Sequence, residues 1–472
     1  MTASTPLHDL HATELLARYG DRSLSPVEVT RAVLDRIAAW EPHLHATYAL
    51  DAEAAIAAAH IAETRWQKHR DSGEPIGALE GVPVMIKENI ATAGVPVPVG
   101  TAASELVPAA GDAPPAARLR EAGAVILGKT TMPDYGMLTS GLSSLHALTR
   151  NPWDLSKNPG GSSAGAAAGV AAGYGPLHLG TDIGGSVRLP AGWCGIFALK
   201  PSLGRVPIDP PYAGRVAGPM TRTVKDAALM MGVLAQPDAR DTMSLPHQAI
   251  EWKRLERDVK GLRIGLMMSA GVGLAVDAEV AEAIEAAAAK FEAAGAHVER
   301  IAPFLTPTMF SGVDAFWRMR AWLDISALPA ERKAKVLPFI VAWAEGGAAS
   351  SGADVFRGYS QMGAMRDAAV AATQPFDVLL SPTAPIAACA AELPCPTDDP
   401  ARPFEHIAFT LAFNMSEQPA ASIDCGHTKG GLPIGLQIVG HRHDDLGVLQ
   451  VAAAWEAMRG PARPWPEPPA SA

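Results

Sequence analysis

The sequence has few cysteines, and this scarcity excludes two classes of small, cross-linked protein. Four cysteines occur among 472 residues, and none is paired at a spacing typical of metal ligands. A disulfide framework and a zinc module both need more cysteines, at regular intervals. We therefore expect free thiols in a reducing compartment and a cytoplasmic location. The four are Cys194, Cys389, Cys395 and Cys425.

The chain also lacks a basic surplus and a long unbroken apolar run. It carries 39 Lys and Arg against 49 Asp and Glu, for a formal net charge of −10. Nucleic-acid backbones are bound by clustered Lys and Arg, so no nucleic-acid partner is expected. The most apolar stretch, 164–179, is interrupted by glycines and by His178, which argues against a membrane span. Residues 1–10 lack the basic start and apolar centre of a secretory signal.

What the chain does contain is an alternation of short apolar runs and helical stretches. Helices are predicted over 276–294 and 444–458, between runs that are typical of buried strands. This alternation predicts an α/β fold with a central mixed β-sheet flanked by helices. The predicted strands are Val82–Ile86, Ala124–Leu127, Leu177–Leu179, Ile196–Leu199, Arg263–Met267, Val378–Leu380 and Ile434–Val439.

Three segments differ from this pattern. Residues 1–70 are predicted to be helical, and Ser25 to Glu28 combine an N-cap serine, a first-turn proline and a capping-box glutamate. The segment from about 300 to 370 is rich in aromatic residues and is expected to form helices that cover one side of the sheet. The proline-rich tail, 461–472, is expected to be poorly ordered. No boundary suggests more than one domain, so 1–472 is interpreted as a single domain.

Two serines and one lysine carry the strongest chemical signal. Ser162 and Ser186 each follow a pair of glycines, and Lys87 ends an apolar strand. Serine is a weak nucleophile that needs an adjacent base, and a lysine can be that base if desolvation lowers its pKa. Backbone amides beside Gly184 and Gly185 can turn toward a developing oxyanion. Together these residues indicate hydrolytic acyl transfer that uses no histidine.

Three other motifs invite different hypotheses. Gly123–Thr130 fits the letters of a phosphate-binding loop, but its variable positions are apolar strand residues rather than loop residues. Gly161–Gly165 fits a nucleophile elbow centred on Ser163, which would make the protein a serine esterase, although no strand precedes it. His441–Asp445 could suggest a metal, but Asp444 as a helix cap explains the cluster more simply.

The order of several long motifs resembles the amidase signature family over most of the chain. Gly160–Gly165 reads Gly-Gly-Ser-Ser-Ala-Gly, and Gly180–Arg188 reads Gly-Thr-Asp-Ile-Gly-Gly-Ser-Val-Arg. Gly81–Asn89 is similar to the family's lysine strand, and Gly431–Gly440 is similar to a segment near its end. The family commonly carries Leu-Gly-Lys-Thr where this chain has the false phosphate-binding loop.

The resemblance implies a fold and a set of roles. It implies the amidase signature fold, with Ser186 as the nucleophile and Lys87 as the base. Ser162, preceded by a cis peptide bond, would bridge them. Such a site would need no metal and no cofactor, and its partners would be a small amide or carbamate and water. The oxyanion hole would consist of the backbone amides of Ile183, Gly184, Gly185 and Ser186.

The resemblance also bears on the branch of the family. The glutaminase subunit of tRNA-dependent amidotransferases usually has glutamine after the motif arginine and an Asp-Gln segment downstream. Here Leu189 follows Arg188, and 214–219 contains no Asp-Gln pair. These departures favour a stand-alone hydrolase of C–N bonds, acting on aryl amides or carbamates with esterase side activity. The glutaminase subunit stays open as an alternative, and a homodimer is compatible with the sequence.

The expected pocket is largely apolar. The family builds one wall from the residues after the strand that ends at Lys129, and the only fixed charge expected there is Asp134. Aromatic residues of the covering segment could face the cleft or pack within their own helices; these are Phe316, Trp317, Trp322, Phe339 and Trp343. Apolar pockets with few polar anchors favour aryl substrates. The candidate substrate-binding residues are Tyr135, Gly136, Met137, Thr139 and Gly161.

Overall fold

The computed structural model describes residues 5–470, and one mixed β-sheet organises them. Eleven strands of this described part join in the order β1-β3-β2-β4-β6-β5-β10-β11-β9-β7-β8. The strands are β1 (Thr47–Tyr48), β2 (Pro83–Lys87), β3 (Val125–Thr130), β4 (Leu177–Asp182), β5 (Phe197–Lys200), β6 (Val216–Thr221), β7 (Arg263–Leu266), β8 (His297–Arg300), β9 (Val378–Pro382), β10 (Ala420–His427) and β11 (Pro433–Val439).

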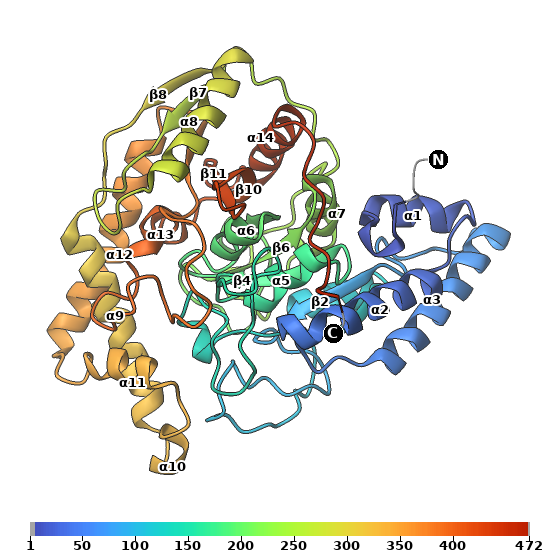
Figure 1. Ribbon diagram of the computed structural model, residues 1–472, viewed down its shortest axis with the longest axis horizontal. Coiled ribbons are helices and arrows are strands. Elements are labelled where there is room, and N and C mark those ends of the chain that lie inside the picture. The colour runs from blue at the N-terminus through green and yellow to red at the C-terminus, as the bar shows by residue number, and fades with distance from the viewer. Residues whose placement is uncertain (1–4, 471–472) are drawn as a thin grey trace.

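Helices surround the sheet, with the N-terminal helices grouped at one end and α9 to α12 at the other (Figure 1). They are α1 (Ala12–Gly20), α2 (Pro26–Leu44), α3 (Ala52–Ser72), α4 (Pro114–Glu121), α5 (Ala164–Ala172), α6 (Arg188–Cys194), α7 (Val224–Leu234), α8 (Ala278–Ala293), α9 (Pro307–Ser326), α10 (Ala330–Lys333), α11 (Pro338–Glu345), α12 (Gly352–Thr373), α13 (Ala408–Met415) and α14 (Asp445–Met458). Three short 3-10 helices span Leu7–Asp9, Asp134–Gly136 and Glu405–Ile407 in the described chain.

The parallel arrangement of β2 and β4 brings distant chemistry together. Ile86 of β2 lies opposite Leu179 of β4, so both strands end at the same edge of the sheet. Lys87, the last residue of β2, therefore lies beside Thr181, near the end of β4. The turn that carries Ser186 leaves from that same edge and leads into α6.

Each of the seven predicted strands is present, with ends shifted by a few residues. The prediction missed β6 and β10 because their sequences contain small residues in place of a β-branched run, and β6 also contains Pro219. It also missed both edge strands: β8 is polar and mostly exposed, and the two-residue β1 lies within 1–70, which was predicted to be helical. The helices expected over 276–294 and 444–458 are α8 and α14, and Ser25 forms the capping box of α2 that its sequence predicts.

The expectation of a poorly ordered C-terminal tail is wrong for the described residues up to 470. The tail runs back along the molecule toward α2 (Figure 1), and Arg36 forms an ion pair with Glu467. The guanidinium carbon of Arg222 lies 4.3 Å from the centre of the Trp465 ring. Proline richness limits helix and strand formation, but it does not prevent such cation–π and ionic contacts from holding an extended segment.

Within residues 5–470, no helix combines the length and the apolar character needed to cross a membrane.

Candidate functional site

Lys87 is fully buried at the end of β2, and its side-chain nitrogen donates hydrogen bonds to Ser162 and Thr181. Its Nζ lies 2.7 Å from Ser162 Oγ, 3.0 Å from Thr181 Oγ1 and 3.4 Å from the Thr181 carbonyl oxygen. Burial lowers the pKa of Lys87 well below its usual value, and the nearby Arg215 cation lowers it further. Asp182 and Glu88 oppose this shift. A neutral amine is therefore favoured at this position.

Ser162 lies between Lys87 and the cavity on a tightly packed backbone. The Gly161–Ser162 peptide bond is cis, as the family resemblance implies. A Cβ at position 161 would lie 2.5 Å from the Ser140 nitrogen and 2.8 Å from the Leu138 carbonyl oxygen. Only glycine fits this close approach, which explains the residue type in front of Ser162.

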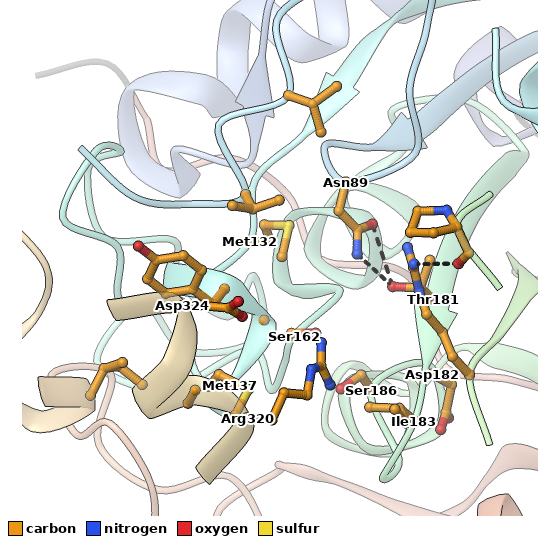
Figure 2. A pocket seen from close by; sticks show the side chains of 18 of the residues that line it. Asn89, Met132, Met137, Ser162, Thr181, Asp182, Ile183, Ser186, Arg320 and Asp324 are labelled. Atoms are coloured by element: carbon orange, nitrogen blue, oxygen red, sulfur yellow. Dashed lines mark hydrogen bonds between the residues drawn. The ribbon is translucent and has the colours of Figure 1, made fainter. Parts of the chain in front are cut away.

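The turn that carries Ser186 wraps around the Asp182 carboxylate. Asp182 accepts hydrogen bonds from the Gly185 amide at 2.8 Å and the Val187 amide at 3.1 Å. Gly185 has a φ of 127°, which L-residues rarely adopt, so glycine permits the turn. Ser186 is half-buried, and it lines the same cavity as Ser162 (Figure 2).

Arg188 holds the Asp182 carboxylate from the opposite side. Its Nη2 lies 3.0 Å from Asp182 Oδ1, and its Nε lies 3.0 Å from Oδ2. Both side chains are fully buried, and this contact keeps the pKa of Asp182 well below its usual range despite the opposing effect of burial. Arg188 also donates to Asn414 Oδ1 at 2.6 Å and to Gln437 Oε1 at 2.7 Å. The predicted motif arginine therefore ties the turn to α13 and β11.

The four amides predicted to form an oxyanion hole are not equivalent in this structure. The Gly185 amide already donates to Asp182. Among the described residues, no hydrogen-bond partner is found for the amides of Ile183, Gly184 and Ser186. These three amides are free to donate to a substrate oxygen, whereas Gly185 serves the carboxylate.

Two adjacent cavities are lined by Ser186. The wide cavity has a volume of about 310 Å³ and the narrow cavity about 40 Å³. They share Ser186, Ile183, Gly136, Met137 and Arg320. The narrow cavity is otherwise mostly apolar, and its remaining lining residues are Leu138, Thr139, Gly184, Leu189, Trp317, Phe404 and Ile407.

Most of the predicted pocket residues lie where the sequence places them. Tyr135, Gly136 and Met137 line the wide cavity, and Thr139 lines the narrow one. Gly161 lines neither cavity and packs behind Ser162.

Aromatic residues of the covering segment, about 300 to 370, were candidates to face the cleft, and one of them does. Of the five aromatic candidates, Trp317 lines the narrow cavity, and the other four line neither cavity in the described structure. Trp343, for example, is buried and donates from Nε1 to Asp314 at 2.9 Å. A second aromatic residue of the narrow cavity, Phe404, lies beyond the covering segment.

The sequence interpretation of the pocket's charge is wrong. Asp134 is fully buried and accepts hydrogen bonds from the Ser144 and Leu337 amides instead of lining a cavity. The wide cavity carries Asp182 and three further charged residues that sequence reasoning missed, Arg215, Arg320 and Asp324. For the α9 residues a signal existed, because Trp317, Arg320, Ala321 and Asp324 recur at the spacing of one helical face.

Two residues that the sequence analysis did not identify as candidates, Thr181 and Asn89, form hydrogen bonds beside Lys87. Thr181 accepts from Lys87 Nζ through both its hydroxyl and its carbonyl oxygen. Asn89 Nδ2 donates to Thr181 Oγ1 at 3.1 Å (Figure 2). Hydrogen bonds among side chains from two strands cannot be inferred from either sequence segment alone.

The competing motifs have structural explanations. Lys129 is a buried residue of β3 and donates to Thr92 Oγ1 at 2.7 Å, so the phosphate-binding pattern is a strand, as its composition predicts. Ser163 is fully buried, and its hydroxyl donates to the Thr181 carbonyl at 3.3 Å. Asp444 caps α14 by accepting from the Gly447 amide at 3.0 Å, which confirms its predicted role. Among residues 5–470, no group of three or more His, Cys, Asp or Glu side chains could hold a metal ion.

The sheet, the buried Lys87–Ser162 contact and the serine-bearing turn agree with the amidase signature resemblance, and comparisons with known proteins identify an amide-hydrolysing enzyme. A family model described as Amidase matches residues 28–449, and the chain belongs to the amidase signature family. It is 35% identical over 473 residues to an acylamidase from Rhodococcus erythropolis, covering 97% of this chain and 96% of that protein.

Two further relatives mark the breadth of the family. The chain is 35% identical over 491 residues to the A subunit of glutamyl-tRNA(Gln) amidotransferase from Myxococcus xanthus (strain DK1622), covering 95% of this chain and 97% of that one. The crystal structure of a bacterial aryl acylamidase of the amidase signature family superposes with a TM-score of 0.88 at 31% identity. That match covers 96% of this chain and 97% of the other, and it confirms the predicted fold.

Proposed function

We propose that this enzyme hydrolyses amides that carry an apolar or aromatic group, through an acyl-enzyme intermediate on Ser186. The observation that carries the proposal is the contact between Lys87 Nζ and Ser162 Oγ at 2.7 Å, directly behind a cavity that Ser162 and Ser186 line together. Within the described chain, no carboxylate oxygen lies within 4.0 Å of Lys87 Nζ. A buried lysine without a counter-ion is favoured in its neutral, basic form.

The reaction follows from this arrangement. Ser186 Oγ attacks the amide carbonyl carbon while its proton passes to Ser162, and the Ser162 proton passes to the neutral Lys87. The carbonyl π-bond opens to an oxyanion, which the free amides of Ile183, Gly184 and Ser186 can stabilise. One such donor contributes about 2.7–4 kcal/mol in related transition states.

Collapse of the tetrahedral intermediate completes the first half of the reaction. The C–N bond breaks, and the proton held by Lys87 returns through Ser162 to the leaving nitrogen, which departs as an amine. Water then attacks the acyl ester and gives a proton to the same relay. The ester C–O bond breaks, Ser186 recovers its proton, and a carboxylic acid leaves.

The narrow cavity supports an apolar or aromatic substrate group. Leu189, Trp317 and Ile407 contribute hydrocarbon to it, directly beside Ser186. Burying one such group stabilises a complex by roughly 1.5–3 kcal/mol. The names of two relatives, an acylamidase and an aryl acylamidase, agree with this substrate class. Carbamates and esters form the same tetrahedral intermediate and are included in the proposal.

The glutaminase subunit of an amidotransferase is the second candidate, because relatives with amidotransferase names match over most of the chain. The apolar Leu189 in the narrow cavity favours the first candidate. A glutaminase would prefer glutamine over an anilide, so the two candidates differ in a simple rate comparison.

The test is covalent trapping with a fluorophosphonate that carries an aryl group. We expect one adduct, mapped by mass spectrometry to Ser186, and no adduct in the Ser186→Ala variant. Ser163→Ala is the matched control, because this neighbouring serine is buried and bonded to Thr181. Labelling of Ser163 in the wild-type enzyme would restore the nucleophile-elbow hypothesis and overturn the proposed role of Ser186.

A further inference from the structure

Two arginines line the wide cavity without a carboxylate partner. Arg215 is half-buried, and its Nη1 donates to the Pro210 carbonyl at 3.0 Å. The Arg320 guanidinium carbon lies 4.4 Å from the centre of the Tyr212 ring. Among the described residues, neither guanidinium has a carboxylate oxygen within 4.0 Å.

The buried arginines of this protein are neutralised, whereas Arg215 is half-buried and Arg320 is exposed. Arg188 is paired with Asp182 and Arg205 with Asp445, both at 3.0 Å. Arg215 has no such partner: burial lowers its pKa, and the nearby charge of Arg320 lowers it further. Two like charges at one cavity repel each other, and a bound anion relieves that repulsion.

Neither of the two acids that line this cavity neutralises them, because Asp182 is already paired with Arg188. Asp324 follows Arg320 by one helical turn on α9, yet the two form no ion pair within 4.0 Å. Figure 2 shows Arg320 extending toward Ser162 and Ser186, with the Asp324 carboxylate apart from its guanidinium. The region next to Ser186 is therefore positively charged.

We propose that the preferred substrates are amides that bear a carboxylate, bound by Arg215 and Arg320 in the wide cavity. The apolar part of the same molecule points toward the residues of the narrow cavity, with the scissile carbonyl at Ser186 between the two. Guanidinium groups bind carboxylates through two parallel hydrogen bonds, which fixes the orientation of the bound group. This inference rests on the proposed function and adds a specificity element to it.

The experiment compares two matched pairs of anilides. Acetanilide and 4-acetamidobenzoate differ by a carboxylate on the amine side, whereas butyranilide and succinanilate differ by one on the acyl side. In at least one pair, we expect kcat/KM for the carboxylate member to exceed that for the neutral member by about tenfold or more. The pair that shows this preference identifies the side of the amide bond that occupies the wide cavity.

Substitution of Arg320 tests whether this residue causes the preference for the carboxylate-bearing anilide. Arg320→Met should reduce the ratio of the two kcat/KM values by about tenfold, whereas Arg320→Lys should retain part of it, because it keeps the charge and loses the planar fork. Arg357→Met removes a surface arginine that is paired with Asp354 on α12, and it should leave the ratio unchanged. Circular dichroism of each variant establishes that it is folded.

The outcomes separate this inference from the proposed function. Equal kcat/KM within both pairs, or an unchanged ratio in folded Arg320→Met, would overturn the carboxylate site while the amidase proposal stands. Failure of the folded wild-type enzyme to cleave any of the four anilides would overturn the proposed substrate class, and the inference with it.

Discussion

Arg188 and Asp182 form a fully buried ion pair across the turn that carries Ser186, with two contacts of 3.0 Å each. The same carboxylate accepts the Gly185 and Val187 amides. One side chain therefore neutralises Arg188 and also sets the path of the backbone between β4 and α6. Loss of this carboxylate should affect stability and catalysis together.

Asp182→Asn should lower the free energy of unfolding by about 3–5 kcal/mol, because it leaves Arg188 buried without a counter-charge. Urea unfolding followed by circular dichroism measures this change. Asp354→Asn removes one member of an exposed pair with Arg357 and should change the unfolding midpoint far less. An Asp182→Asn enzyme with the wild-type unfolding midpoint would contradict the prediction.

The ion pair also predicts the direction of acid sensitivity. Because the folded protein holds the pKa of Asp182 well below its usual value, the carboxylate stabilises the fold at pH values above the unfolded pKa of about 4. This contribution is lost as the pH falls below that value. The difference in unfolding free energy between the wild-type protein and Asp182→Asn should therefore become smaller as the pH is lowered.

Lys87→Ala should lower kcat/KM for an anilide by about 10²–10⁴, the usual contribution of a general base. In the wild-type enzyme, kcat/KM should rise with pH as Lys87 loses its proton, with a midpoint below 10.5, because burial lowers its pKa. Burial also lowers the pKa values of Lys129 and Lys200 to about 7, so the rise is assigned to Lys87 only if it disappears in the variant.

A surface lysine provides the control for this experiment. Lys68 is exposed on α3, and Lys68→Ala should leave both the rate and the pH profile unchanged. Near-normal turnover of Lys87→Ala, with the wild-type pH profile, would exclude Lys87 as the base.

Exhaustive treatment with a chelator should leave the hydrolysis rate unchanged. The proposed proton relay runs through Lys87, Ser162 and Ser186, and the described residues contain no cluster of three potential metal ligands. The measurement is anilide turnover before and after dialysis against EDTA. Loss of activity that zinc restores would show that a metal takes part.

An anilide or an aryl carbamate should be cleaved with a higher kcat/KM than glutamine or acetamide. An aryl group buries more apolar surface against the apolar residues beside Ser186 than acetamide or glutamine does, and the difference should be roughly 10- to 100-fold. Steady-state kinetics on acetanilide, phenyl carbamate, glutamine and acetamide provide the comparison. Glutamine as the best of the four substrates would support the amidotransferase candidate instead.

Local sequence was sufficient wherever a motif is continuous along the chain. The apolar runs at 82–86 and 434–439 predicted strands because burial on both faces selects such residues regardless of what they pair with. The glycine pairs before Ser162 and Ser186 predicted turns that only glycine permits, and the structure contains both. These features depend on the residues themselves and on their immediate neighbours.

Tertiary structure decided which charges face the cavity. Arg320 and Arg215 are separated by more than a hundred residues, and no local pattern shows that they line one cavity while Asp134 is turned away from it. The Pro219-containing strand β6 is ordered by its pairing with β4 and β5, and the C-terminal tail by Arg36 and Arg222. Sequence by itself was enough to nominate Ser162 and Ser186 as candidate reacting groups, because the glycines before them mark the turns that carry them. Packing determined the pocket's charge, because a long, flexible arginine side chain can face solvent or substrate from the same position in a helix.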